Sequence, residues 1–274
     1  MNLLTSLTAT IFISCVEMVY LLGVLIAVGF LLGVIERYSN HMLVRAFGPR
    51  GVLLTAWIGT PIHELGHLMM CFIFGHRVTR VKLLQLNSPD GTLGYVEHQY
   101  NLNSFYQQVG NFFIGLGPIF SGIGSLILGM YLLVPKAYEA FTQQIQQRIA
   151  LETLDVNVLR SVGEVLFELC KSLFSFENLI SPSFWLFIVI AISISSHIAL
   201  SRPDIRNSAK GLQIIFILLV LFNIAGKILH IDSYGLVVRI AEYNAYLLAF
   251  SGIAILFSLI TLAVSFILAK VKGA

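Results

Sequence analysis

Two histidines four positions apart, with a glutamate directly after the first, are the residues best suited to chemistry: His63, Glu64 and His67. On a helix, residues four positions apart share a face, so the two imidazoles can bind one metal ion together. Glu64 then lies where it can act as general base for the attacking water without ligating the metal. This HExxH pattern is typical of zinc-dependent peptidases, so we expect zinc as the cofactor.

A second group of polar residues follows an apolar stretch and includes His197, Ser201 and Asp204. A tetrahedral zinc site needs a third protein ligand and keeps its fourth position for water, and Asp204 and His197 are the candidates. Each has a structural alternative, because Asp204 can close a capping box with Ser201 and His197 can be a hydrogen-bonded core residue. Pro203 disfavours a helix through the residue before it. We therefore expect one helix to end there with His197 on it, and Asp204 to lie in the first turn of the next.

The composition places these residues in a membrane protein. Of the 274 residues, 57% are apolar and 11% are charged, and the mean hydropathy is +0.85. Soluble domains carry about 25% charged residues, so a soluble globular domain is excluded. The net charge of +3 is too small and too dispersed for a nucleic-acid-binding protein, and the expected partner is the lipid bilayer.

Apolar runs of about 20 residues predict transmembrane helices. We expect an all-α polytopic membrane protein with about six of them, near residues 11–35, 51–75, 110–134, 182–200, 212–229 and 244–269. Lysines and arginines divide almost evenly between the two sides of this arrangement. Four of the basic residues on one side lie in the long connection at 135–181, where the bias is diluted, and Lys270 and Lys272 directly follow the last run, so we expect both termini in the cytoplasm. The expected location is the plasma membrane.

Two connections between the apolar runs have structure of their own. Residues 77–100 contain two β-prone runs around a turn at 88–91, which predicts a β-hairpin. Residues 135–181 show helical spacing of apolar side chains, which predicts an amphipathic segment along the membrane surface. We expect one membrane-embedded domain over residues 1–274, with its core at 51–215.

Together these features resemble the site-2 protease group of intramembrane zinc metalloproteases. The resemblance covers residues 51–215 and includes the HExxH helix, the hairpin after it, a helix with Gly117-Pro118, and an aspartate after a proline at the start of a later helix. It implies that Asp204 is the third zinc ligand. Where the family has Asn-Pro-Asp-Gly, this chain has Arg202-Pro203-Asp204-Ile205, and Ser121 stands where the family has asparagine.

From the motif and the resemblance we expect a zinc-dependent intramembrane endopeptidase that cleaves a membrane-protein substrate in or near a transmembrane segment. The expected metal ligands are His63, His67 and Asp204. The expected catalytic residues are Glu64, as base, and His197, as oxyanion donor or alternative ligand.

The second strand of the predicted hairpin, within residues 92–100, offers an edge to an extended substrate. A membrane helix must unwind before its peptide bonds can be reached, and a strand edge supplies the backbone partners that unwinding removes. The resemblance implies the same role. The alternative is a hairpin anchored to anionic headgroups by Arg77, Arg80 and Lys82.

Two other functions remain open at this point. A membrane zinc protease of the prenyl-protein-processing type needs a glutamate as third ligand, and Glu164 and Glu168 are the downstream candidates. A non-enzymatic pseudoprotease or transporter would keep the polar cluster for binding.

Overall fold

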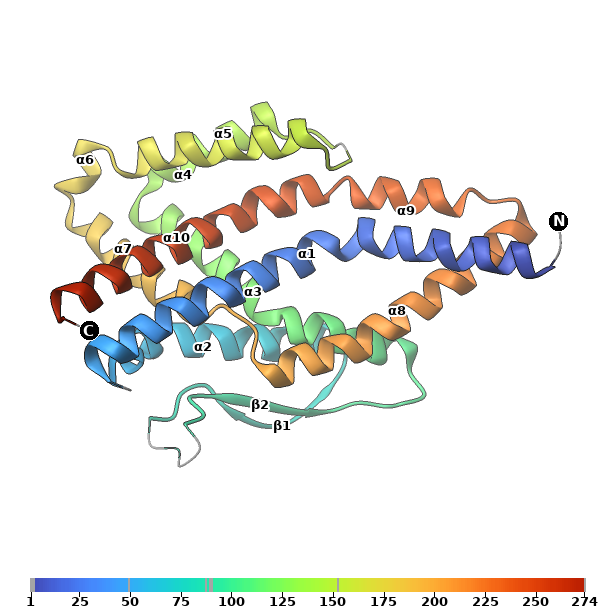
Figure 1. The fold of residues 1–274 in the computed structure, drawn as a ribbon, viewed down its shortest axis with the longest axis horizontal. Coiled ribbons are helices and arrows are strands. Elements are labelled where there is room, and N and C mark those ends of the chain that lie inside the picture. Colours follow the sequence, from blue (N-terminus) through green and yellow to red (C-terminus); the bar gives the residue numbers. More distant parts are fainter. Residues whose placement is uncertain (1–2, 49, 87, 89–90, 152, 274) are drawn as a thin grey trace.

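The computed structural model describes residues 3–48, 50–86, 88, 91–151 and 153–273. Long helices packed side by side make up most of them, and one small sheet lies along one side (Figure 1). In chain order the elements are α1 (Leu3–Phe47), α2 (Arg50–Ile73), β1 (Arg77–Lys82), β2 (Tyr95–Gln99), α3 (Phe105–Leu133), α4 (Pro135–Arg148), α5 (Val156–Leu173), α6 (Phe176–Leu179), α7 (Pro182–Ser195), α8 (Arg202–Leu229), α9 (Ser233–Ala241) and α10 (Asn244–Val271).

Four helical stretches of the described chain are long and apolar enough to cross a bilayer: Thr5–Phe47, Phe105–Leu133, Arg202–Leu229 and Ser233–Val271. This supports a predominantly α-helical membrane protein. Two of the six predicted spans, at 51–75 and 182–200, are not among these four stretches. Helix α7 has 14 residues and is about 21 Å long, which is shorter than the apolar thickness of a bilayer, and α2 carries the ionisable residues of the motif.

Helices α7 and α8 run in the same direction, and both are antiparallel to α3 (Figure 1). A Cβ at Gly129 of α3 would lie 3.3 Å from the ring of Phe187 in α7. Earlier along α3, a Cβ at Gly115 would lie 2.5 Å from the carbonyl oxygen of Asp204 in α8. The predicted spans at 182–200 and 212–229 thus correspond to two helices that follow one another in the same direction, separated by a break at residues 196–201.

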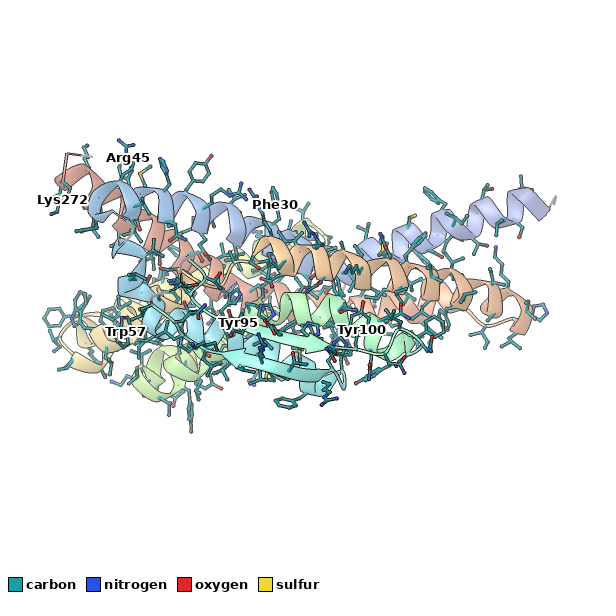
Figure 2. All side chains as sticks on the ribbon, turned by 90° about the horizontal axis from the view of Figure 1, so that it is seen from below. Phe30, Arg45, Trp57, Tyr95, Tyr100 and Lys272 are labelled. Atoms are coloured by element: carbon teal, nitrogen blue, oxygen red, sulfur yellow. The ribbon has the colours of Figure 1, made fainter. Side chains whose placement is uncertain are left out.

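Helix α10 runs parallel to α1, which places the two chain ends at opposite ends of the molecule (Figure 1). Asn244, at the start of α10, donates from Nδ2 to the carbonyl oxygen of Tyr20 at 2.5 Å. At the other end of α10, the ammonium group of Lys272 lies over the ring of Phe47. Figure 2 shows Arg45 and Lys272 at this same end. The packing therefore does not support the prediction that both termini lie on the cytoplasmic side.

The predicted hairpin is confirmed as an antiparallel pair of strands. Arg77 lies opposite Gln99 at one end of the ladder, and Lys82 lies opposite Tyr95 at the other. The middle of the predicted turn, residues 89–90, lies outside the described residues. The hairpin lies along α2, so it is held beside the helix that carries the motif (Figure 1).

The segment at 135–181 is largely helical, as its spacing predicts. It forms α4, α5 and α6, and α4 and α5 pack as an antiparallel pair along α10 (Figure 1). Phe141 of α4 contacts Phe250 of α10 ring to ring, and Tyr246 donates from its hydroxyl to the carbonyl oxygen of Ile149. The apolar face predicted for this segment is buried in α5, because it packs against other helices.

The motif helix α2 and helix α3 make a close contact at two glycines, Gly66 of α2 and Gly117 of α3. A Cβ at Gly117 of α3 would lie 2.5 Å from the carbonyl oxygen of Gly66 and 2.9 Å from the backbone nitrogen of His67. One turn further along α3, the Ser121 hydroxyl donates to the carbonyl oxygen of Ile62 at 2.7 Å. Backbone atoms cannot move aside as a flexible side chain does, so any side chain at Gly117 must push α2 away.

We predict that Gly117→Ala lowers the free energy of unfolding by about 1–3 kcal/mol through overpacking. The matched control is Gly124→Ala in the same helix, where a Cβ has open space. That control should be neutral or gain about 0.5–1 kcal/mol from helix propensity. Denaturant unfolding in detergent micelles measures both, and equal effects of the two substitutions would contradict the close helix contact.

Candidate metal centre

Helix α2 brings His63 and His67 together on one face, as the spacing predicts. Their rings are one turn apart, and the two Nε2 atoms are 3.2 Å from each other. His67 is buried and His63 is half-buried. The helix is fixed in rotation by its contact with α3, so the face that carries both histidines points toward the start of α8.

Each ring is oriented by a backbone carbonyl on its far side. Nδ1 of His63 donates to the carbonyl oxygen of His197, and Nδ1 of His67 donates to that of Ile114, both at 2.7 Å. A carbonyl oxygen can only accept, so both Nδ1 atoms carry the proton. A neutral ring with its proton on Nδ1 presents the Nε2 lone pair, which is the tautomer that a metal ligand needs.

Asp204 completes a group of three acceptors. Its Oδ1 lies 3.2 Å from Nε2 of His67, and its Oδ2 lies 3.6 Å from Nε2 of His63. A tetrahedral zinc ion with bonds of about 2.0–2.1 Å places its ligand atoms about 3.3 Å apart. The residues therefore fit a zinc ion. Three acceptors that face one another in a buried site also need a positive charge between them, whether from a metal ion or a proton.

Asp204 forms the predicted helix cap and also lies among the three acceptors. Asp204 lies in the first turn of α8 as predicted, and it forms a capping box with Ser201. Its Oδ2 accepts from the backbone N–H of Ser201 at 2.7 Å, and its own backbone N–H is 3.4 Å from the Ser201 hydroxyl. The cap fixes the orientation of the carboxylate, which is what a metal ligand needs from the residues around it.

His197 lies in the break between α7 and α8, so its predicted place on the preceding helix is corrected: α7 ends at Ser195. The His197 side chain does not join the three acceptors. Its Nδ1 is 3.3 Å from the carbonyl oxygen of Ser193, and its Nε2 is buried without a partner among the described residues. The contact of His197 with the candidate ligands is through its backbone carbonyl, which orients His63.

Glu64 lies beside the three acceptors without bonding to any described side chain. The residue is 6% exposed and lines a cleft of about 550 Å³, which is also lined by His63, His67 and Asp204. A Cβ at Gly94 of the hairpin would lie 2.7 Å from Cγ of Glu64, so only glycine lets this segment approach so closely. An acid that faces the cleft with free oxygens is suited to act as general base.

Sequence reasoning missed three residues of the cleft and its surroundings: Glu36 of α1 and the pair His76 and His98. His76 donates from Nε2 to the carbonyl oxygen of Gln107, and its Nδ1 lies 3.0 Å from Nδ1 of His98. Burial, together with the nearby His76 and His67, lowers the pKa of His98 to about 4, so His98 is neutral at neutral pH. Glu36 and His76 each adjoin an apolar run, which is a signal in the sequence, whereas His98 lies between Glu97 and Gln99 and has no such signal.

The alternative third ligands lie elsewhere in the fold. Glu164 pairs with Arg148 and Arg160 on the surface formed by α4 and α5, and Glu168 pairs with Lys171. Among the described residues, the group that could hold a metal ion is His63, His67 and Asp204. No family model, curated protein or solved structure matches the chain.

We predict that Asp204→Ala strongly weakens zinc binding, because it removes one of three converging ligand atoms. His197→Ala should keep zinc, because the backbone carbonyl that orients His63 remains. Metal content after loading with zinc, together with competition against a chelator, measures both effects. If Asp204→Ala kept full zinc while His197→Ala lost it, the third ligand would be His197.

Proposed function

We propose that this protein is a zinc-dependent intramembrane endopeptidase that hydrolyses a peptide bond in or near a transmembrane segment of a membrane-protein substrate. The observation that carries the proposal is the convergence of His63, His67 and Asp204 in the cleft that the carboxylate of Glu64 also lines. The resemblance of the motifs to the site-2 protease group supports the same assignment.

In this proposal His63, His67 and Asp204 hold the zinc ion. When bound, zinc supplies Lewis acidity, which polarises a carbonyl group and lowers the pKa of water. Glu64 takes the proton from the attacking water and passes it to the leaving amine. His197 orients His63 through its carbonyl. Its predicted role as oxyanion donor would need a proton on Nε2, and a neutral ring with Nδ1 toward the Ser193 carbonyl carries none there.

The substrate is proposed to bind as an extended strand along β2. Strand β1 pairs with one edge of β2, and within the described residues the other edge has no strand. Residues 92–96 line the cleft, so a segment paired along them would pass close to Glu64. Backbone pairing would replace the hydrogen bonds that the substrate helix loses when it unwinds. Anchoring of the hairpin to lipid headgroups is compatible with this role.

For the membrane arrangement we propose passages by α1, α2, α3, the α7–α8 pair and α9–α10. The alternating directions of these passages in the packing support this arrangement in place of six spans. An odd number of passages places the two termini on opposite sides of the membrane. The lipid bilayer is the partner in this proposal, and the plasma membrane is the proposed location.

One observation favours a second candidate function. A proton on one imidazole would also satisfy the three acceptors, as an imidazolium paired with Asp204. In that case the protein is a pseudoprotease or transporter that uses the cluster for binding. Stoichiometric zinc in the purified protein distinguishes the two.

We predict that Glu64→Gln keeps zinc and loses about 10²–10⁴-fold in turnover, because it removes the general base but no ligand. The test measures zinc content and cleavage of a panel of single-span membrane proteins reconstituted in liposomes with the zinc-loaded protein. The matched control is Glu168→Gln, which makes the same change in an exposed ion pair of α5. Near-normal turnover in the Glu64→Gln protein would contradict the proposed chemistry.

A further inference from the structure

We infer that Glu36 of α1 is a positioning residue of the metal centre, which holds the break between α7 and α8 in the conformation that presents Asp204 and the His197 carbonyl. The inference rests on the proposed metal site. Glu36 is not one of the converging ligands, and it follows the long apolar run of α1. Two observations support this role: the hydrogen bond between Glu36 and Ala199, and the position of that bond between two cavities.

The contact joins residues that are 163 positions apart. Oε2 of Glu36 accepts a hydrogen bond from the backbone N–H of Ala199 at 2.8 Å, and no other described residue accepts from that N–H. Ala199 lies in the middle of the break, between His197 and Ser201.

The Glu36–Ala199 contact also separates two cavities. One is the cleft of about 550 Å³ that contains the metal centre, and the other is a cavity of about 440 Å³ between α1, α3 and α8. Glu36, Ala199 and Leu200 line both. The second cavity is lined mainly by apolar side chains such as Ile26 and Leu212, which offer no acceptor. Among the polar residues of this cavity, Asn40 is 3.5 Å from Oε1 of Glu36 through its Nδ2, and Glu36 is the residue that accepts from the Ala199 N–H.

Three backbone groups of the break are bonded to three side chains from different parts of the chain. The His197 carbonyl accepts from His63, the Ala199 N–H donates to Glu36, and the Ser201 N–H donates to Asp204. Two of these side chains are candidate metal ligands. Because the Glu36 contact lies between the other two, its loss releases the segment that fixes the His63 ring and the Asp204 carboxylate.

The test compares Glu36→Leu, which removes the acceptor, with Glu36→Gln, which keeps an acceptor oxygen. The matched control is Glu17→Leu, because Glu17 is another buried carboxylate of α1 and accepts from Asn223 of α8, away from the break. The first measurement is hydrogen–deuterium exchange of residues 196–201 in the metal-free protein. The second is zinc affinity by competition with a chelator.

For Glu36→Leu we expect faster exchange in the break and zinc affinity about 10–100-fold weaker, as is typical when a residue that orients ligands is lost. Glu36→Gln and Glu17→Leu should stay close to wild type in both measurements. If Glu36→Leu does not fold, Glu36→Ala makes the same test, because it removes the acceptor without adding bulk.

Wild-type exchange and wild-type zinc affinity in the Glu36→Leu protein would overturn the inference. Equal losses in Glu17→Leu would also overturn it, because they would show a general effect of removing a buried acid from α1. If the wild-type protein binds no zinc, the proposed function fails, but exchange in the break still decides the role of Glu36: faster exchange supports it and unchanged exchange overturns it.

Discussion

A break between two helices packed inside a protein leaves N–H and C=O groups that have lost their helical partners, so other parts of the protein must supply those partners. The break between α7 and α8 meets this constraint with side chains from α1, α2 and α8. The same hydrogen bonds fix the tautomer of His63 and the orientation of the Asp204 carboxylate. The hydrogen bonds that satisfy the backbone of the break are therefore the same ones that assemble the candidate metal centre.

The close contact of α2 with α3 supplies the other half of the centre. Gly66 and Gly117 let the two backbones approach until the Ile114 carbonyl can accept from His67. The two imidazoles are thus held by carbonyls from two different directions, with both Nε2 lone pairs toward Asp204. Repulsion among these acceptors is relieved only by a positive charge, and this connects the packing of the helices to the proposed chemistry.

Local patterns in the sequence predicted the elements and most of the site. The spacing of His63 and His67, the β-prone runs of the hairpin and the capping box at Asp204 each depend on residues a few positions apart, and each is present in the fold. The direction of each passage was not predictable in this way. Residues 182–229 contain two apolar runs, and this pattern is the same whether α8 turns back beside α7 or continues in its direction. The contacts of both helices with α3 show that α8 continues in the direction of α7.

Long-range partners were also beyond the sequence. Glu36 and Ala199 are far apart in the chain, and nothing near Glu36 indicates that a backbone N–H of the break needs an acceptor. His197 was predicted as a side-chain ligand or donor because it belongs to a polar group after an apolar stretch, whereas its backbone carbonyl makes the contact with His63. Every residue has a backbone carbonyl, so the residue type cannot indicate which carbonyl accepts a hydrogen bond from a side chain.

X-ray absorption at the zinc edge of the zinc-loaded protein tests the central claim most directly, because it reports the atoms bound to the metal. The account predicts one zinc per chain, with two imidazole nitrogens at about 2.0–2.1 Å, completed by oxygen ligands from Asp204 and water. A shell with sulfur, with three imidazoles or without imidazole would contradict it, as would a protein that retains no stoichiometric zinc.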